Sequence, residues 1–133
     1  MKIKGEFEVK LSPMENYAQG LDGVKLGRMS LDKVFKGELN AESKGEMLSA
    51  ITAISGSAGY VAIEQVSGSL SGLKGTFVLM HYGIMDQGNQ TLNLEVIPNS
   101  GAGELKGLRG KMKIEIKEGK HFYEFEYKLP ENV

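Results

Sequence analysis

The chain has no cysteine and no tryptophan, and only 3 of its 133 residues are proline. Without cysteine, disulfide bonds, thiolate nucleophiles and cysteine-ligated metal sites are excluded. Basic and acidic residues nearly cancel, at 16 against 17, so nothing in the charge favours a nucleic-acid or membrane partner. No apolar run approaches the roughly 20 residues that span a bilayer, and the N-terminal residues do not resemble a signal peptide. We therefore expect a cytoplasmic protein.

Glycine is the residue in excess, with 18 copies, which is about twice the usual share of roughly 7%. Each glycine inside a helix costs about 1 kcal/mol relative to alanine, so this composition favours turns and bent strands over helices. The length fits a single domain, residues 1–133, that is large enough to bury its own core.

Alternation of apolar and polar residues predicts most of the secondary structure as strands. The pattern is clearest near the two ends of the chain, where charged residues occupy every second position. In the second segment we expect Gly37 to mark a bend within the strand. The predicted strands cover residues 3–11, 24–39, 39–54, 60–66, 76–82, 91–97, 105–116 and 123–129.

Residues 39–54 are the ambiguous segment. Apolar residues recur there at helical spacing, at Met47, Leu48, Ile51 and Ile54. Glycine and small hydroxyl residues interrupt that pattern, and no charged outer face follows Glu46. We predict a strand, with an amphipathic helix as the alternative.

About eight strands joined by short turns predict a meandering antiparallel sheet. Closing such a sheet removes its unpaired edges, and an eight-stranded barrel encloses just enough room for side chains or one small ligand. The expected fold is therefore all-β, a closed antiparallel eight-stranded barrel with little helix. A β-sandwich is the alternative.

The strands at residues 60–66 and 76–82 are apolar on both faces. Both faces of such a strand need to be shielded from water, one by the core and the other by a further part of the protein or by a partner. Because a barrel strand that is apolar outside needs a partner, we expect a homo-oligomer that forms through these two strands.

Glu64 is an odd residue in this setting, because a carboxylate on a strand with two apolar faces needs a lumen, a partner or an exposed rim. If the following turn is centred between Ser71 and Gly72, Ala62 pairs opposite His81, and Glu64 and His81 share one face. A register slip by one residue would put them on opposite faces.

An apolar lumen that holds a carboxylate, an imidazole and a phenol has the composition of a small-ligand pocket, and it is equipped to move a proton. Glu64 and His81 are the candidate catalytic pair. The predicted ligand-binding residues are Tyr60, Glu64, Phe77, His81 and Tyr127. A packed polar pair without any ligand is the plainer interpretation of Glu64 and His81, and a core aromatic is the plainer interpretation of Tyr127.

Glycine-rich stretches of similar pattern occur twice, at residues 68–81 and 103–116. Both predict turns that lead into strands, because neither has the spacing of a dinucleotide-binding or phosphate-binding loop. The two histidines, His81 and His121, lie 40 residues apart on strands with no carboxylate at ligand spacing. We therefore expect no metal and no cofactor.

The chain resembles a family of small, uncharacterised bacterial proteins whose calycin-like barrel is similar to that of allene oxide cyclase. The resemblance implies an eight-stranded barrel and no particular activity, since the family has none established. Analogy with the cyclase, which holds a fatty-acid-derived epoxide and steers its cyclisation with a carboxylate, concerns the fold alone. The residues that carry the resemblance are Phe35-Lys36-Gly37-Glu38-Leu39, residues 58–64, residues 68–72, residues 75–79, His81, residues 100–105 and Phe125-Glu126-Tyr127.

Three functions therefore stay open. The barrel holds a small apolar or amphipathic molecule, or it is an isomerase-like or cyclase-like enzyme with Glu64 and His81 as acid and base, or it is an interaction module without a ligand.

Overall fold

The computed structural model of the chain describes residues 1–131, and in this range it contains strands and no helix. The prediction of an all-β protein is confirmed, and the ambiguous segment forms a strand over Leu39–Ile51 and no helix. In the described range no helix has the length and apolar character needed to cross a membrane. The strands are β1 (Lys2–Pro13), β2 (Lys25–Gly37), β3 (Leu39–Ile51), β4 (Ala58–Leu70), β5 (Leu73–Asp86), β6 (Asn89–Val96), β7 (Ala102–Gly103), β8 (Arg109–Lys117) and β9 (Lys120–Lys128).

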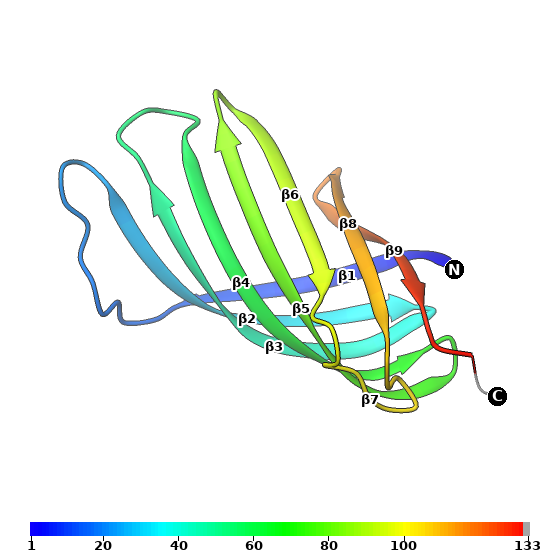
Figure 1. The fold of residues 1–133 in the computed structure, drawn as a ribbon. Coiled ribbons are helices and arrows are strands. Elements are labelled where there is room, and N and C mark those ends of the chain that lie inside the picture. The colour runs from blue at the N-terminus through cyan, green and yellow to red at the C-terminus, as the bar shows by residue number, and fades with distance from the viewer. Residues whose placement is uncertain (132–133) are drawn as a thin grey trace.

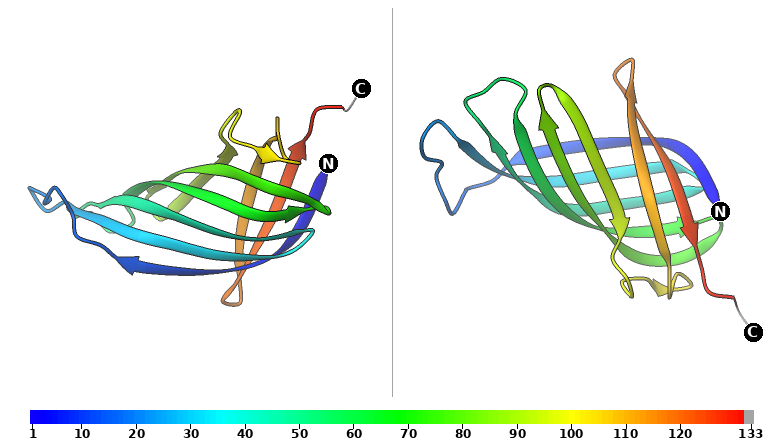
Figure 2. Two further views of the ribbon diagram at one scale, coloured as in Figure 1. Left: turned by 90° about the horizontal axis from the view of Figure 1, so that it is seen from below. Right: turned by 45° about the horizontal axis from the view of Figure 1, so that its top comes forward.

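Eight of these strands close into an antiparallel barrel (Figure 1). Neighbours around the barrel follow the chain from β1 to β6, then continue through β8 and β9, and β9 pairs with β1. The two-residue strand β7 pairs only with β5 and is an addition to the barrel. Two further views show the strands curving around one common interior (Figure 2). Closing a sheet pairs its two edges, which is the reason for expecting a barrel from eight strands joined by short turns. The weakest pairing is that of β6 with β8, which joins only Leu94 to Met112 and Glu95 to Lys111 and leaves the facing edges of these two strands unpaired toward their hairpin ends.

Tight turns set the register of the hairpins. Between β4 and β5 the two turn residues are Ser71 and Gly72, with φ of 48° and 85°. Positive φ at both positions is the geometry that matches the twist of a two-residue hairpin. Of the two registers that the sequence left open, the structure has the one centred between Ser71 and Gly72, in which Ala62 pairs with His81 and Glu64 pairs with Leu79.

The sequence interpretation was wrong at Gly37, and also at residues 105–108, which were predicted as strand but lie in the connection before β8. Gly37 is the more informative case. It ends β2 at the turn into β3, with φ of 111°, and does not bend a continuous strand. The apolar alternation runs on across the turn because Phe35 and Leu39 both point into the core. Because the alternation of apolar and polar residues continues in step across this tight turn, the sequence pattern gives no sign that the strand ends there.

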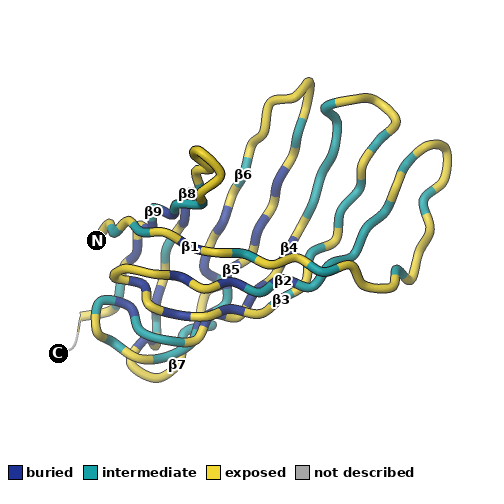
Figure 3. Tube along the Cα trace, turned by 180° about the vertical axis from the view of Figure 1, so that it is seen from behind, coloured by how far each residue is buried: buried dark blue, intermediate teal, exposed yellow. Residues whose placement is uncertain are grey.

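One end of the barrel is closed by core side chains. The connection between β6 and β8 crosses this end and buries Leu105 and Leu108 almost completely. Gly107, in the turn between them, has φ of 83°, close to that of Gly72 in the related glycine-rich stretch. Buried residues gather toward this end, whereas exposed and intermediate residues follow the long hairpins at the other (Figure 3). The barrel is therefore filled at one end only.

The opposite end is where the long hairpins finish. The connections at this end are residues 14–24, 52–57, 87–88 and 118–119. Inward-facing side chains become more exposed toward it: along β1, Phe7 is buried, Val9 is half-buried and Leu11 is 43% exposed. This gradient identifies the end with the long hairpins as the open one.

Candidate functional site

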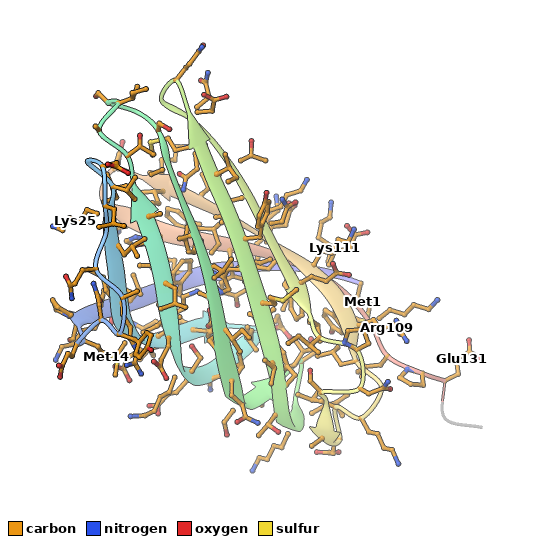
Figure 4. All side chains as sticks on the ribbon, turned by 60° about the vertical axis from the view of Figure 1, so that its left-hand side comes forward. Met1, Met14, Lys25, Arg109, Lys111 and Glu131 are labelled. Atoms are coloured by element: carbon orange, nitrogen blue, oxygen red, sulfur yellow. The ribbon has the colours of Figure 1, made fainter. Side chains whose placement is uncertain are left out.

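A cavity of about 380 Å³ occupies the open half of the barrel. Its lining comes from all eight barrel strands, because alternate residues of each strand point inward. The sticks in Figure 4 show side chains on both sides of the strands, inside the barrel and out toward solvent. The cavity is thus the part of the lumen that the core side chains leave unfilled.

The wall of the cavity is mainly apolar. Val9, Leu31, Leu92 and Ile114 contribute to it from four different strands. At the rim lie residues such as Ile116, which is 65% exposed. A small molecule that entered from the open end would first meet aliphatic surface.

The inner end of the cavity is polar. Four buried polar side chains meet there: Lys33 from β2, Ser43 from β3, Glu64 from β4 and His81 from β5. Lys33 Nζ donates a hydrogen bond to Glu64 Oε2 at 2.8 Å, and Ser43 Oγ donates to Glu64 Oε1 at 2.7 Å. His81 Nε2 is hydrogen-bonded to Glu64 Oε2 as well. These four residues, which we call the polar cluster, are centred on one carboxylate.

The carboxylate of Glu64 is held in its ionised form. Burial by itself opposes the charge, but the hydrogen bond from His81 and the nearby Lys33 ammonium outweigh it and lower the Glu64 pKa to about 2. Glu64 has no exposed surface, and both of its oxygens are already bonded. Glu64 is therefore an anion that orients its neighbours, and it does not touch the contents of the cavity.

His81 presents its other ring nitrogen to the cavity. In the described chain no fully buried side-chain nitrogen or oxygen lacks a hydrogen-bond partner, and Nδ1 of His81 has no such partner. Nδ1 therefore keeps some accessible surface. The side chain points inward while its neighbours Met80 and Tyr82 point out, so that surface faces the lumen. Since an ionised carboxylate only accepts, Nε2 carries the proton, and Nδ1 of the neutral ring is an acceptor.

Tyr60 lies beside His81 on the same face. The two rings are in edge contact, with centroids 6.3 Å apart. A side chain at Gly83, the residue paired with Tyr60, would come within 2.3 Å of the Tyr60 ring, so this glycine makes room for the ring. Burial, followed by the negative charge of Glu64, raises the Tyr60 pKa to about 12. The phenol therefore stays protonated as a hydrogen-bond donor.

Lys33 is the cationic member of the polar cluster. Its ammonium group lies 5.0 Å from the centre of the Phe7 ring and 5.7 Å from that of Phe35. Both distances are typical of cation–π contacts. The positive charge of Lys33 balances the negative charge of Glu64, so the polar cluster carries no net charge when His81 is neutral.

No group of three His, Cys, Asp or Glu side chains in residues 1–131 is arranged to hold a metal ion.

The structure separates the five predicted ligand-binding residues into two sets. Tyr60 and His81 line the cavity, and Glu64 lies directly behind His81. Phe77 stacks on Phe125 in the core, and Tyr127 packs against Phe125 and hydrogen-bonds Ser71 at the closed end. Neither Phe77 nor Tyr127 belongs to the lining of this cavity.

Lys33 and Ser43 are site residues that the sequence analysis did not propose. The signal was present for Lys33, a lone charged residue on the side of its strand that also carries Leu31 and Phe35. Ser43 follows Leu39 and Ala41 at the same spacing of two, but a serine on an apolar face is too common to stand out. His121, the second histidine, lies at the rim and contacts the Phe7 ring.

Comparison with known proteins places the chain in a family. A solved structure of a protein with unknown function from Shewanella oneidensis MR-1 is 60% identical, has a TM-score of 0.97, and is matched over 99% of this chain and 98% of its own. That protein is from the DUF3224 family, and the model of the same family matches residues 3–127 here. No curated protein matches the chain. The chain therefore belongs to DUF3224, a family of proteins of unknown function.

Proposed function

We propose that the barrel binds one small, mainly apolar molecule whose polar group reaches the cluster at the cavity floor. The observation that carries this proposal is the cavity itself, about 380 Å³ of aliphatic wall ending at buried polar side chains. Ligand sites usually measure roughly 300–1,000 Å³ and combine apolar walls with a few converging polar groups. A barrel that served only as a scaffold would gain stability by filling this volume.

The polar groups determine how the ligand is oriented. His81 lines the cavity next to the polar cluster, with the Tyr60 ring beside it, whereas Val9, Leu92 and Ile114 are apolar residues of the wall. An amphipathic molecule is therefore held with its polar group inward and its apolar part toward the opening. The wall offers the apolar part a surface without charge, and the floor replaces the hydrogen bonds that the polar group loses with water.

Replacing Val9 with tryptophan is expected to abolish binding in the cavity, because the larger side chain fills the lumen. The measurement is a fluorescence titration with 1-anilinonaphthalene-8-sulfonate, an amphipathic probe. We expect the probe affinity to fall about tenfold or more, since such a loss corresponds to about 1.4 kcal/mol of lost contact.

The matched control is Val61→Lys, which changes an apolar residue on the outside of the barrel. It leaves the affinity unchanged if the probe sits in the lumen. A probe that binds Val9→Trp as well as the native protein, and is lost with Val61→Lys, would show that the outer surface is the binding site and would overturn the proposal.

We also propose that a second copy of the chain covers the outer face of β3, β4 and β5. Large apolar side chains there lie in register across three strands and are each about half exposed. One row consists of Leu48, Val61 and Tyr82, and the next places Ile63 beside Met80. Apolar patches of this continuity mark interaction surfaces on most soluble proteins.

Charge is consistent with a second copy as the partner. The depression over this face is bordered by charges of both signs, Arg28 from β2 and Lys44 and Glu46 from β3, and Arg28 pairs with Glu46 within the chain. In a two-fold contact the same patch meets itself, so Lys44 is able to approach the partner's Glu46 and the reverse. A surface with a single sign of charge would repel its own copy.

Replacing Ile63 with lysine is expected to separate the copies, because a buried unpaired ammonium is costly at an apolar interface. Light scattering at micromolar concentration should give twice the 14.5 kDa chain mass for the native protein and one chain mass for the variant. Val34→Lys, on the outside of β2 and away from this face, is the control. A native protein that is already monomeric would exclude the interface.

Two broader expectations belong to the same proposal. The first is that the barrel is calycin-like and similar to that of allene oxide cyclase, and it is supported by eight antiparallel strands around a lumen open at one end. The second is a cytoplasmic location, and it is supported by the lack of cysteine and the near-neutral charge.

A further inference from the structure

We infer that His81 acts as a general base that moves a carbon-bound proton on an apolar carbonyl compound held in the cavity, with Glu64 as its positioning residue and Tyr60 as hydrogen-bond donor to the carbonyl oxygen. The inference rests on the proposed function, because the substrate must first occupy the lumen. It goes beyond ligand binding by assigning a reaction class, the isomerisation of a β,γ-unsaturated ketone or aldehyde to its conjugated isomer.

The first argument is the way in which His81 is held. Its Nε2 is bonded to a buried carboxylate, which selects the tautomer and leaves the lone pair of Nδ1 toward the lumen. A buried anion behind one imidazole nitrogen also stabilises the imidazolium that forms when the other nitrogen takes a proton. Glu64 is in turn held by Lys33 and Ser43, so the ring has little freedom to turn away.

The groups that face His81 from the neighbouring elements are few. From β4 come Tyr60 and Glu64, and from β2 comes Lys33. The paired residue on β6 is Leu94, and His121 on β9 lies at the rim of the same cavity. The ammonium of Lys33 is paired with Glu64, so the Nδ1 side of the His81 ring meets the apolar lumen, with the Tyr60 ring in edge contact with that of His81.

The step balances without any other reactant. His81 Nδ1 takes the proton from the carbon that lies between the carbonyl group and a carbon–carbon double bond, the C–H electron pair forms a new C=C bond to the carbonyl carbon, and the carbonyl π pair moves to the oxygen. The oxygen of this dienolate accepts a hydrogen bond from the Tyr60 hydroxyl, which stabilises the developing negative charge. The imidazolium returns the proton to the far carbon of the original double bond, the carbonyl group forms again, and the double bond is now conjugated with it. No electron acceptor or donor is required.

A probe reaction tests the base directly. 5-Nitrobenzisoxazole is a small apolar compound from which a base removes one carbon-bound proton while the ring N–O bond breaks, giving a coloured phenolate. We expect saturable turnover by the native protein that falls about tenfold or more with His81→Gln. Glu8→Gln, which removes an exposed carboxylate from the outside of β1, should keep the native rate.

The outcomes separate the two proposals. If the probe saturates the native protein but His81→Gln reacts as fast, the base assignment is overturned and ligand binding stands. If NMR titration detects no binding of the probe to the native protein, the proposed function fails, and the base assignment fails with it.

A second measurement on the native protein does not depend on a variant that folds. Nitrogen-15 NMR of the histidine rings should find His81 protonated at Nε2 and bare at Nδ1. A proton on Nδ1 alone would overturn the assignment. Glu64→Gln tests the positioning role: it should mix the two tautomers and lower the maximal rate while the half-saturating concentration of the probe stays near the native value.

Discussion

Replacing Glu64 with alanine is expected to lower the free energy of unfolding by about 3–5 kcal/mol. The substitution leaves the Lys33 ammonium buried, with no opposite charge at 2.8 Å, and also removes the acceptor for Ser43 and His81. A charge buried without its partner is among the few causes of so large an effect. Urea unfolding at neutral pH measures the difference.

The matched control is Glu46→Ala, on the neighbouring strand. Glu46 forms an exposed ion pair with Arg28 at 2.6 Å, and such pairs contribute about 1 kcal/mol or less. Adding Lys33→Met to a Glu64→Met variant should restore at least half of the loss, because both charges are then gone. A Glu64→Ala protein as stable as Glu46→Ala would contradict the central role of the carboxylate.

Acidification is expected to remove about 3 kcal/mol of stability through Glu64 alone. The folded pKa of Glu64 is about 2, below its ordinary value of 4.5. A carboxyl group whose pKa is lowered by folding stabilises the protein above its unfolded pKa, and the stabilisation is lost as the pH falls through the folded pKa. The loss therefore occurs between about pH 5 and pH 2.

Other carboxylates also titrate in this range, so the comparison is with Glu64→Gln. Urea unfolding is measured for both proteins at a series of pH values. The native curve should fall more steeply, and the two proteins should approach each other in stability at the acid end. Parallel curves would mean that Glu64 has an ordinary pKa in the folded protein.

The pairing of β4 with β5 was predictable from the sequence because it depends on local chemistry. Ser71 and Gly72 form a two-residue turn, and the turn sets the register of every residue that follows. Glu64 and His81 are 17 residues apart on that one hairpin. Their meeting on one face therefore required no knowledge of the rest of the chain.

The partners from other hairpins were beyond this reasoning. Lys33 is 31 residues from Glu64, and Ser43 reaches Glu64 across the pairing of β3 with β4. Each lies on the inward face of its strand, but only the curvature of the closed sheet brings Lys33 to the same point in the lumen. The same limit applies to Phe77 and Tyr127. Whether an inward-facing residue lies in the core or in the cavity wall depends on its depth along the barrel, and the sequence does not give this depth.

The amino-acid sequence by itself determined that this protein is an antiparallel all-β chain of about eight strands joined by short turns, because alternation and turn residues act locally. It favoured a closed barrel over a sandwich, and it placed a carboxylate and an imidazole on the two strands of one hairpin. Only the tertiary structure decided which end of the lumen is filled, and it placed Lys33 and Ser43 around Glu64. Both features depend on how the sheet closes and on how deep each residue lies in the barrel. These are set only when eight strands from the whole chain pack around one interior.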